Sequence, residues 1–188
     1  MEKNLKPICL VIALSFLALI GCAYNKSSVP DLLVDNQQIT TTVNPDSART
    51  DCDTLVITCI DYRFAFANQE FINDTLGLKD NYDHISIPGS IYNLVNPETR
   101  ELLFSKFALS VGLHLIKRVV IISHRDCGGY GGSASFGSEI SEYETLCADL
   151  KKARALLIEK YPTLEVNLFL ESLVKDDDEL KVHFEKIP

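Results

Sequence analysis

The sequence predicts an α/β fold in which a mainly parallel β-sheet is flanked by helices. Four short, largely apolar runs occupy residues 54–59, 84–87, 118–123 and 165–170, and the first and third are rich in β-branched residues. Such runs are typical of strands that are buried on both faces of a parallel sheet. Helical patterns fill the gaps, as right-handed crossovers between parallel strands require. A further segment, residues 179–185, alternates in polarity and predicts an antiparallel strand at one edge of the sheet.

The helices are predicted from their apolar patterns and their end signals. A short amphipathic stretch follows the first strand and ends at Gly77. Asn96 followed by Pro97 has the chemistry of a helix start, because asparagine caps the free N–H groups and proline suits the first helical position. A longer helix is expected over residues 138–161, where Pro162 stops it.

Composition limits the function classes that fit this chain. The 188 residues are 46% hydrophobic and 23% charged, which suits one folded domain with a modest extension. The formal net charge is −8, and no cluster of lysine and arginine interrupts the acidic balance. A phosphate backbone would be repelled, so we do not expect nucleic-acid binding.

The sequence divides the chain into three segments, residues 1–21, 22–53 and 54–188. The first has lysines before an apolar run that is too short for a transmembrane helix of about 20 residues, which is the plan of a signal peptide. The second is polar and rich in Ser, Thr, Asn and Asp, and we expect it to be a tether. The third holds all the predicted strands and is expected to form the folded domain.

The end of the first segment, Leu-Ile-Gly followed by Cys22, resembles the lipobox of bacterial lipoproteins. The resemblance implies cleavage before Cys22, lipidation of that cysteine, and a membrane-anchored protein that faces the periplasm. The alternative is an ordinary signal peptide or a short anchor helix in which Cys22 is incidental.

Chemistry-bearing residues follow two of the predicted strands. Cys59, Asp61 and Arg63 come after the first strand, and His124 and Cys127 come after the third. Parallel strands end at the same edge of a sheet, where ligands gather in α/β folds. Thiolate and imidazole are preferred ligands of Zn²⁺, and a catalytic zinc has three protein ligands and one open position. We therefore predict that Cys59, His124 and Cys127 bind zinc.

Asp61 and Arg63 alternate with Cys59, so they point to the same side if the strand geometry continues. A carboxylate beside a guanidinium stays ionised and oriented. Such a carboxylate can accept a hydrogen bond from zinc-bound water, or compete with that water for the metal. Taken singly, each of these residues has an ordinary structural interpretation, and the metal site is predicted from their combination.

The pattern Cys59-x-Asp61-x-Arg63, followed by His124-x-x-Cys127-Gly, resembles the β-class carbonic anhydrases, and so does the α/β order from about residue 54 onwards. The resemblance implies one zinc ion per subunit, bound by the two cysteines and the histidine. It also implies an aspartate–arginine dyad that governs access to the fourth metal position. The expected activity is reversible hydration of CO₂ to bicarbonate by a zinc-bound hydroxide, in a homodimer or higher homo-oligomer with the site near the subunit interface.

One segment departs from that family. Residues 87–91, Ile-Pro-Gly-Ser-Ile, stand where family members usually have an Arg-Asn-Ala-Gly-like segment that lines the pocket. The departure leaves two alternatives open. The protein is then a zinc hydrolase that acts on COS or CS₂, or a non-catalytic zinc-binding lipoprotein of the same fold.

The remaining cysteines and histidines give no comparable pattern. Cys52 and Cys147 either form a disulfide or stay as isolated thiols, and the sequence does not decide between the two. His84, His114 and His183 have no ligand-like neighbours in the sequence. The sequence therefore assigns no task to Cys52 or Cys147.

Overall fold

The structure is a computed structural model in which residues 50–188 are described. The predicted signal segment, the lipidation site at Cys22 and nearly all of the tether lie outside the described residues. Between residues 50 and 188, no helix is both long enough and apolar enough to cross a membrane.

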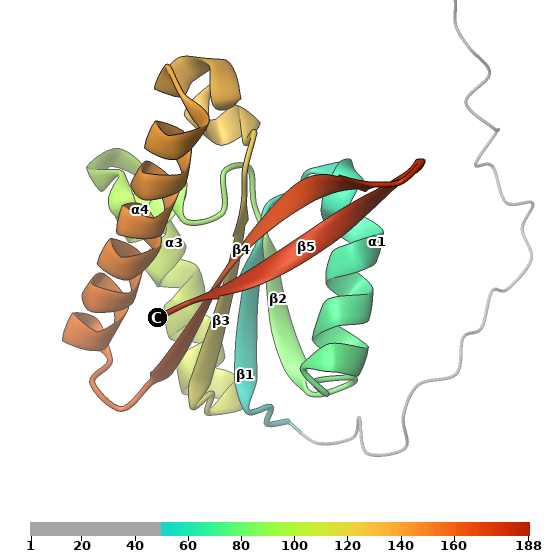
Figure 1. The fold of residues 1–188 in the computed structure, drawn as a ribbon. Helices are drawn as coiled ribbons and strands as arrows, with labels where there is room; N and C mark the ends of the chain where they lie inside the picture. The colour runs from blue at the N-terminus through green and yellow to red at the C-terminus, as the bar shows by residue number, and fades with distance from the viewer. Residues whose placement is uncertain (1–49) are drawn as a thin grey trace, which may run out of the picture. The chain divides into compact units, whose positions relative to one another are not determined.

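Five strands form one sheet in the order β2-β1-β3-β4-β5 (Figure 1). Their bounds are β1 Thr54–Thr58, β2 Tyr82–Ser86, β3 Arg118–His124, β4 Glu165–Asp176 and β5 Glu179–Ile187. The pairs β1–β2, β1–β3 and β3–β4 are parallel, and β4–β5 is antiparallel. The predicted fold class, a mainly parallel sheet with an antiparallel edge strand and flanking helices, is confirmed.

The strand bounds differ from the prediction mainly at β4. This strand has 12 residues and continues well beyond residue 170, where the predicted strand ends. The extension pairs with β5 along its length, from Leu168 opposite Ile187 to Asp176 opposite Glu179. The hydrogen bonds of the antiparallel partner therefore prolong β4 past the apolar run that marks it in the sequence.

The described residues form four α-helices, α1 Tyr62–Glu70, α2 Tyr92–Val95, α3 Pro97–Leu109 and α4 Glu139–Lys160. Two of the four, α3 and α4, begin at the predicted signals. α1 and α3 continue as π-helical turns, η2 Phe71–Thr75 and η3 Ser110–His114, and the loop after β3 contains two 3₁₀ turns, η4 Gly128–Tyr130 and η5 Ser133–Phe136. Asn96 caps α3 by accepting a hydrogen bond from the backbone N–H of Glu98, and Ser138 caps α4 in the same way.

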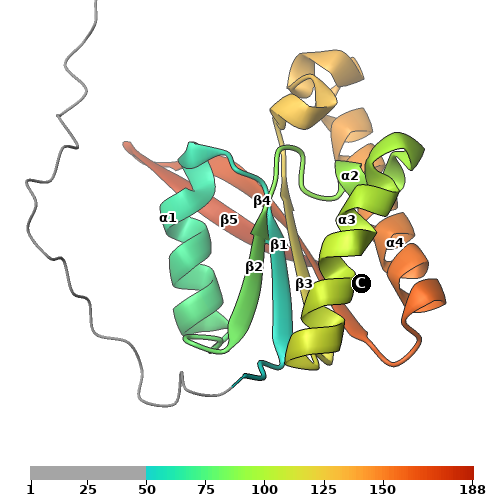
Figure 2. The ribbon, with the colours of Figure 1, turned by 180° about the vertical axis from the view of Figure 1, so that it is seen from behind.

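The helices cover the sheet from both sides, with α1 on one face and α2, α3 and α4 on the other (Figures 1 and 2). Successive side chains of a strand point to opposite faces. In β1, Leu55 and Ile57 therefore pack in the core cluster that contains Phe107 of α3, whereas Val56 packs with Ile72 of η2. This packing fixes the central strands β1 and β3 side by side, with their carboxyl ends at one edge of the sheet.

Candidate metal centre

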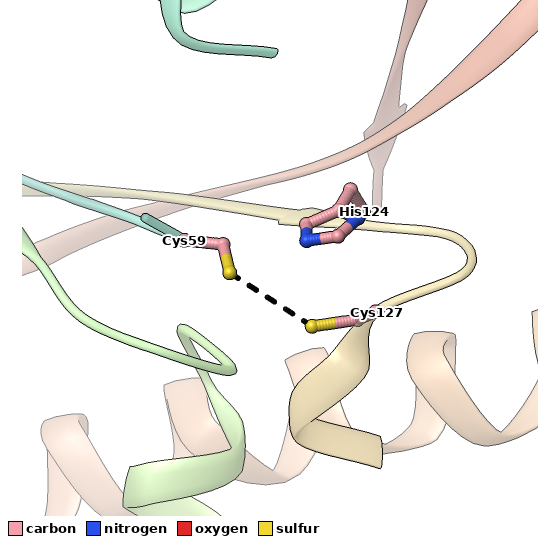
Figure 3. Close-up of side chains that lie close together, drawn as sticks. All are labelled: Cys59, His124 and Cys127. Atoms are coloured by element: carbon pink, nitrogen blue, oxygen red, sulfur yellow. Dashed lines mark hydrogen bonds between the residues drawn. The ribbon is translucent and has the colours of Figure 1, made fainter. Parts of the chain in front are cut away.

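Three predicted ligands meet at the carboxyl ends of β1 and β3. Cys59 directly follows β1, His124 is the last residue of β3, and Cys127 lies in the loop that follows. One ligand atom from each residue lies within 4.8 Å of the other two, and the two Sγ atoms are 3.9 Å apart. Figure 3 shows the three side chains converging on a common point. The parallel pairing of β1 and β3 thus brings Cys59 to two residues that follow it by 65 and 68 positions in the sequence.

The geometry of this cluster fits a zinc ion. Two sulfur ligands of a tetrahedral zinc, each at about 2.3 Å from the metal, lie about 3.8 Å from each other. His124 is fully buried, and among residues 50–188 its Nε2 atom has no hydrogen-bond partner. Its Nδ1 atom lies 2.8 Å from the carbonyl oxygen of Arg125, a contact that orients the ring and leaves Nε2 for a metal. A metal ion would satisfy this buried nitrogen.

The two thiols are electrostatically different. The Cys127 thiol hydrogen-bonds to Cys59 and lowers the pKa of Cys59, with smaller contributions from His124 and the backbone N–H of Gly89. The pKa of Cys127 is raised, first by the Cys59 sulfur and then by burial. Burial acts to lower the pKa of His124, but the Cys59 thiolate and the Arg125 carbonyl outweigh it and raise that pKa. Of the two thiols, Cys59 is therefore the more acidic.

Asp61 and Arg63 form a close ion pair beside the cluster, although they are not placed as the sequence suggests. β1 ends at Thr58, so the strand alternation does not continue to Arg63. Instead, Asp61 is the N-cap of α1 and accepts a hydrogen bond from the backbone N–H of Arg63 at 3.0 Å. The Arg63 Nη2 atom lies 2.7 Å from Asp61 Oδ2, and Nε lies 3.1 Å from both carboxylate oxygens. The helix cap, rather than an extended strand, makes the pair.

Arg63 also binds the loop after β3. Its Nη1 atom donates to Asp126 Oδ2 at 2.8 Å, and its Nη2 atom donates to the Asp126 carbonyl at 3.0 Å. Arg63 hydrogen bonds are the main reason that the pKa of Asp61 lies below its usual value. Asp61 Oδ2 is 3.9 Å from His124 Nε2. An ionised carboxylate therefore lies next to the position that a metal would occupy.

Glu142 of α4 anchors the same loop, and sequence reasoning missed it. Its buried carboxylate accepts hydrogen bonds from Arg125 Nε at 3.0 Å, from the backbone N–H of Asp126 at 2.6 Å and from Ser133 Oγ at 2.8 Å. Burial acts to raise the pKa of Glu142, but these hydrogen bonds together lower it. In the sequence, Glu142 is only one of two acidic residues near a helix start, which is a common feature of helices.

A second buried carboxyl group, Glu171, was also missed. It pairs in register with His124 across β3 and β4, and its Oε1 atom accepts a hydrogen bond from Asn68 at 3.2 Å. Burial raises the pKa of Glu171 to about 8, and the Asn68 hydrogen bond offsets this only in part. The sequence gives no signal for it, because an acidic residue at the end of an apolar run usually marks the end of a strand.

The divergent segment 87–91 forms one wall of the cluster. The backbone N–H of Gly89 donates to Cys59 Sγ at 3.4 Å, and Ser90 Oγ donates to the carbonyl oxygen of Ile122 at 2.9 Å. Gly89 also lies against Gly129, where an added Cβ atom would be 2.5 Å from the Gly89 Cα. The turn after β2 and the loop after β3 therefore approach each other closely next to the cysteine sulfur atoms.

The chain is similar in sequence to known proteins. Two uncharacterized proteins are similar to the chain: one of Rickettsia conorii, 30% identical over 151 residues, and one of Rickettsia bellii, 29% identical over 150 residues. Each alignment covers 76% of this chain, and they cover 81% and 91% of the respective relatives.

Two solved structures also match. The carbonic anhydrase of Glaciozyma antarctica has a TM-score of 0.42 and 15% identity, with 63% of this chain and 75% of that chain covered. The β-carbonic anhydrase CafA of Aspergillus fumigatus has a TM-score of 0.48 and 16% identity, with 73% and 77% covered.

A family model matches residues 49–175, which include all five residues of the predicted site in the folded domain. The match covers more than half of the chain. The protein therefore belongs to the family described as "Putative carbonic anhydrase".

Proposed function

We propose that this protein catalyses the reversible hydration of CO₂ to bicarbonate with a Zn²⁺ ion held by Cys59, His124 and Cys127. The observation that carries the proposal is the convergence of these three side chains beside the ionised carboxylate of Asp61. Membership of the carbonic anhydrase family supports the same assignment.

A zinc ion at this site would lower the pKa of bound water to about 7 and so supply a hydroxide nucleophile near neutral pH. Asp61 remains a hydrogen-bond acceptor, because Arg63 keeps its carboxylate ionised. In that state Asp61 would accept a hydrogen bond from an oxygen bound at the metal position and so hold that oxygen in one orientation. Arg63 acts as a positioning residue, since it fixes the Asp61 carboxylate and the Asp126 loop at once.

The space next to Cys59 suits a small substrate. A cavity of about 160 Å³ lies there, bounded by Asn68, Ile72 and His84 among others. Its lining is partly apolar, and its size accommodates a linear triatomic molecule. A molecule of the size of CO₂, COS or CS₂ fits this volume, so the cavity does not discriminate among the three.

A CO₂ hydration assay on the zinc-loaded chain, joined to zinc analysis, tests the proposal. Wild-type protein should show a rate above that of the buffer. Cys59→Ser should lose one bound zinc ion and fall to the buffer rate, because the first ligand of the cluster is gone. Cys147→Ser is the matched control, since Cys147 is a free, half-buried thiol of α4 outside the cluster.

Wild-type protein that carries the Cys59-dependent zinc ion and yet shows no hydration would refute the carbonic anhydrase proposal. Release of sulfide from COS or CS₂ by the same sample would then identify the related hydrolase. Absence of both activities would leave a zinc-binding protein of this fold.

A further inference from the structure

A second group of metal-ligating side chains lies at the opposite end of the sheet. Cys52 precedes β1, Asp83 is in β2, and His114 is the last residue of η3. One ligand atom from each lies within 4.8 Å of the other two. The amino ends of β1 and β2 lie at the lower end of the sheet in Figures 1 and 2, whereas the loop after β3, which carries Cys127, lies at the upper end.

Backbone and side-chain contacts hold this cluster together. His114 Nδ1 lies 2.7 Å from Asp83 Oδ2 and 3.0 Å from Asp83 Oδ1. The backbone N–H of Cys52 donates to the carbonyl oxygen of His114 at 3.1 Å, which fixes the segment before β1 against the end of η3. All three side chains are half-buried. The three side chains therefore lie together and remain accessible from solvent, and an ion that binds them would replace the hydrogen bond between His114 and Asp83.

The order of the three groups argues against a nucleophilic catalytic triad. Such a triad needs a base in contact with the nucleophile, and the base is in turn oriented by a third group. Here Asp83 interacts with both Cys52 and His114. Burial and the negative charge of Asp83 raise the pKa of Cys52, so the thiol is not activated for attack.

The donor set instead suits a metal ion. Sulfur and imidazole nitrogen are ligands that Zn²⁺ prefers, and a carboxylate oxygen is its third common ligand type. Mg²⁺ and Ca²⁺ prefer sites built from oxygen atoms, so the sulfur and nitrogen donors disfavour them. On binding, the Cys52 thiol would lose its proton to solvent, because the thiolate is the metal ligand.

We propose that Cys52, Asp83 and His114 form a second metal site, which binds a divalent ion of the zinc type independently of the Cys59 cluster. The site links the segment before β1 to β2 and to the end of η3. Its three protein ligands leave the remaining coordination to water, since the side chains of Asp83 and His114 are 25% and 42% exposed.

The first test counts bound zinc in the full chain after equilibration with zinc and removal of the free ion. Wild-type protein and the Cys147→Ser control should bind about two ions per chain, and Cys52→Ser and Cys59→Ser about one each. Asp83→Asn should resemble Cys52→Ser, because the amide is isosteric with the carboxylate but lacks its charge. Equal zinc content in wild type and Cys52→Ser, with circular dichroism showing both folded, would overturn the proposal.

A second test detects the Cys52 sulfur directly. In the Cys59→Ser/Cys127→Ser background, Co²⁺ should produce a thiolate-to-cobalt charge-transfer absorption, because Cys52 can still supply a sulfur ligand. The absorption should vanish when Cys52→Ser is added and persist when Cys147→Ser is added. A folded double variant that gives no such absorption, or one that loses it with Cys147→Ser instead, would refute the second site. Neither result depends on whether the protein hydrates CO₂.

Discussion

At the scale of single residues, Arg63 is the group that joins the metal centre to its surroundings. It pairs with Asp61 at 2.7 Å and with Asp126 at 2.8 Å. Arg63 is the main cause of the lowered pKa of Asp61. The pKa of Asp126 is lowered mainly by a hydrogen bond from the Ser133 N–H and next by the hydrogen bond from Arg63. Removal of this one guanidinium therefore changes the titration of two carboxylates.

We expect Arg63→Met to change how stability depends on acid. The folded-state pKa values of Asp61 and Asp126 lie below the unfolded value of about 3.9, so their contribution is complete above that pH and is lost as the pH falls through the folded values. In metal-free protein, the free energy of unfolding of wild type should exceed that of Arg63→Met most near neutrality. The difference should shrink below about pH 4. Urea unfolding measured across this range gives both quantities.

Arg100→Met is the control for this comparison. Arg100 donates to the backbone carbonyl oxygens of Leu94 and Val95, which do not titrate. Its replacement should lower the free energy of unfolding by a similar amount at each pH. A pH-independent difference for Arg63→Met as well would contradict the role assigned to the two carboxylates.

Residue type and strand position were enough to predict which side chains meet at the candidate metal centre. Cys59 and His124 could be placed because a parallel sheet brings its strand ends together. The role of Asp126 could not be predicted, since it depends on a left-handed backbone conformation, with φ of 56°, that aims its side chain at Arg63 and Ser133. The role of Glu142 could not be predicted either, because its contacts with the loop after β3 depend on how α4 packs.

At the scale of elements, the close approach of two backbone segments sets the position of Cys59. Gly89 donates its N–H to Cys59 Sγ, and Gly129 leaves no room for a side chain against Gly89. The turn after β2 and the loop after β3 are therefore coupled through a contact that only glycine at position 129 permits.

We expect Gly129→Ala to weaken zinc binding at the Cys59 cluster. An added Cβ atom would lie 2.5 Å from the Gly89 Cα and 3.0 Å from the Gly89 N, so one of the two segments must move. Displacement of Gly89 would remove its hydrogen bond to Cys59 Sγ. We expect a loss of zinc affinity of about 10-fold or more, comparable with the loss of an outer-shell contact to a ligand. A competition titration against a chelator measures it.

Gly128→Ala provides the matched control one residue away. No described atom lies within 4 Å of a Cβ atom added there. Zinc affinity should therefore remain close to that of wild type. Equal affinities for the two alanine variants would show that the contact between Gly89 and Gly129 does not position the sulfur.

The elements themselves were predictable where the sequence carries a local signal. β1 and β3 follow β-branched runs, and α3 and α4 start at Asn96 and Ser138, which cap them. The end of β4 carries no such signal, because its last residues are exposed and owe their strand conformation to pairing with β5. After Thr58 two local patterns compete: the alternation of Cys59, Asp61 and Arg63 favours a continued strand, whereas Asp61 is also a preferred N-cap residue, and the structure has the helix start.

At the scale of the whole molecule, large apolar side chains are exposed beside the candidate metal centre. Ile60, Tyr62 and Phe66, around the start of α1, are 57%, 87% and 75% exposed. They flank Asp61 and Arg63, so a partner seated on them would lie next to the site. The resemblance to β-class carbonic anhydrases implies a subunit interface near the metal, and we propose that a second copy of this chain covers this surface. Burial of large apolar side chains supplies the main driving force for such association.

Phe66→Glu should therefore produce monomers. A charge placed at the centre of an apolar interface is buried without a partner on association, so the dimer is destabilised while the isolated fold, in which Phe66 is exposed, is preserved. Leu102→Glu is the matched control, because Leu102 of α3 is 61% exposed on the other side of the sheet. Sedimentation velocity should give a dimer or larger assembly for wild type and for Leu102→Glu, and a monomer for Phe66→Glu. Dissociation by Leu102→Glu instead would place the interface on the face covered by α3, and a monomeric wild-type protein would refute the assembly altogether.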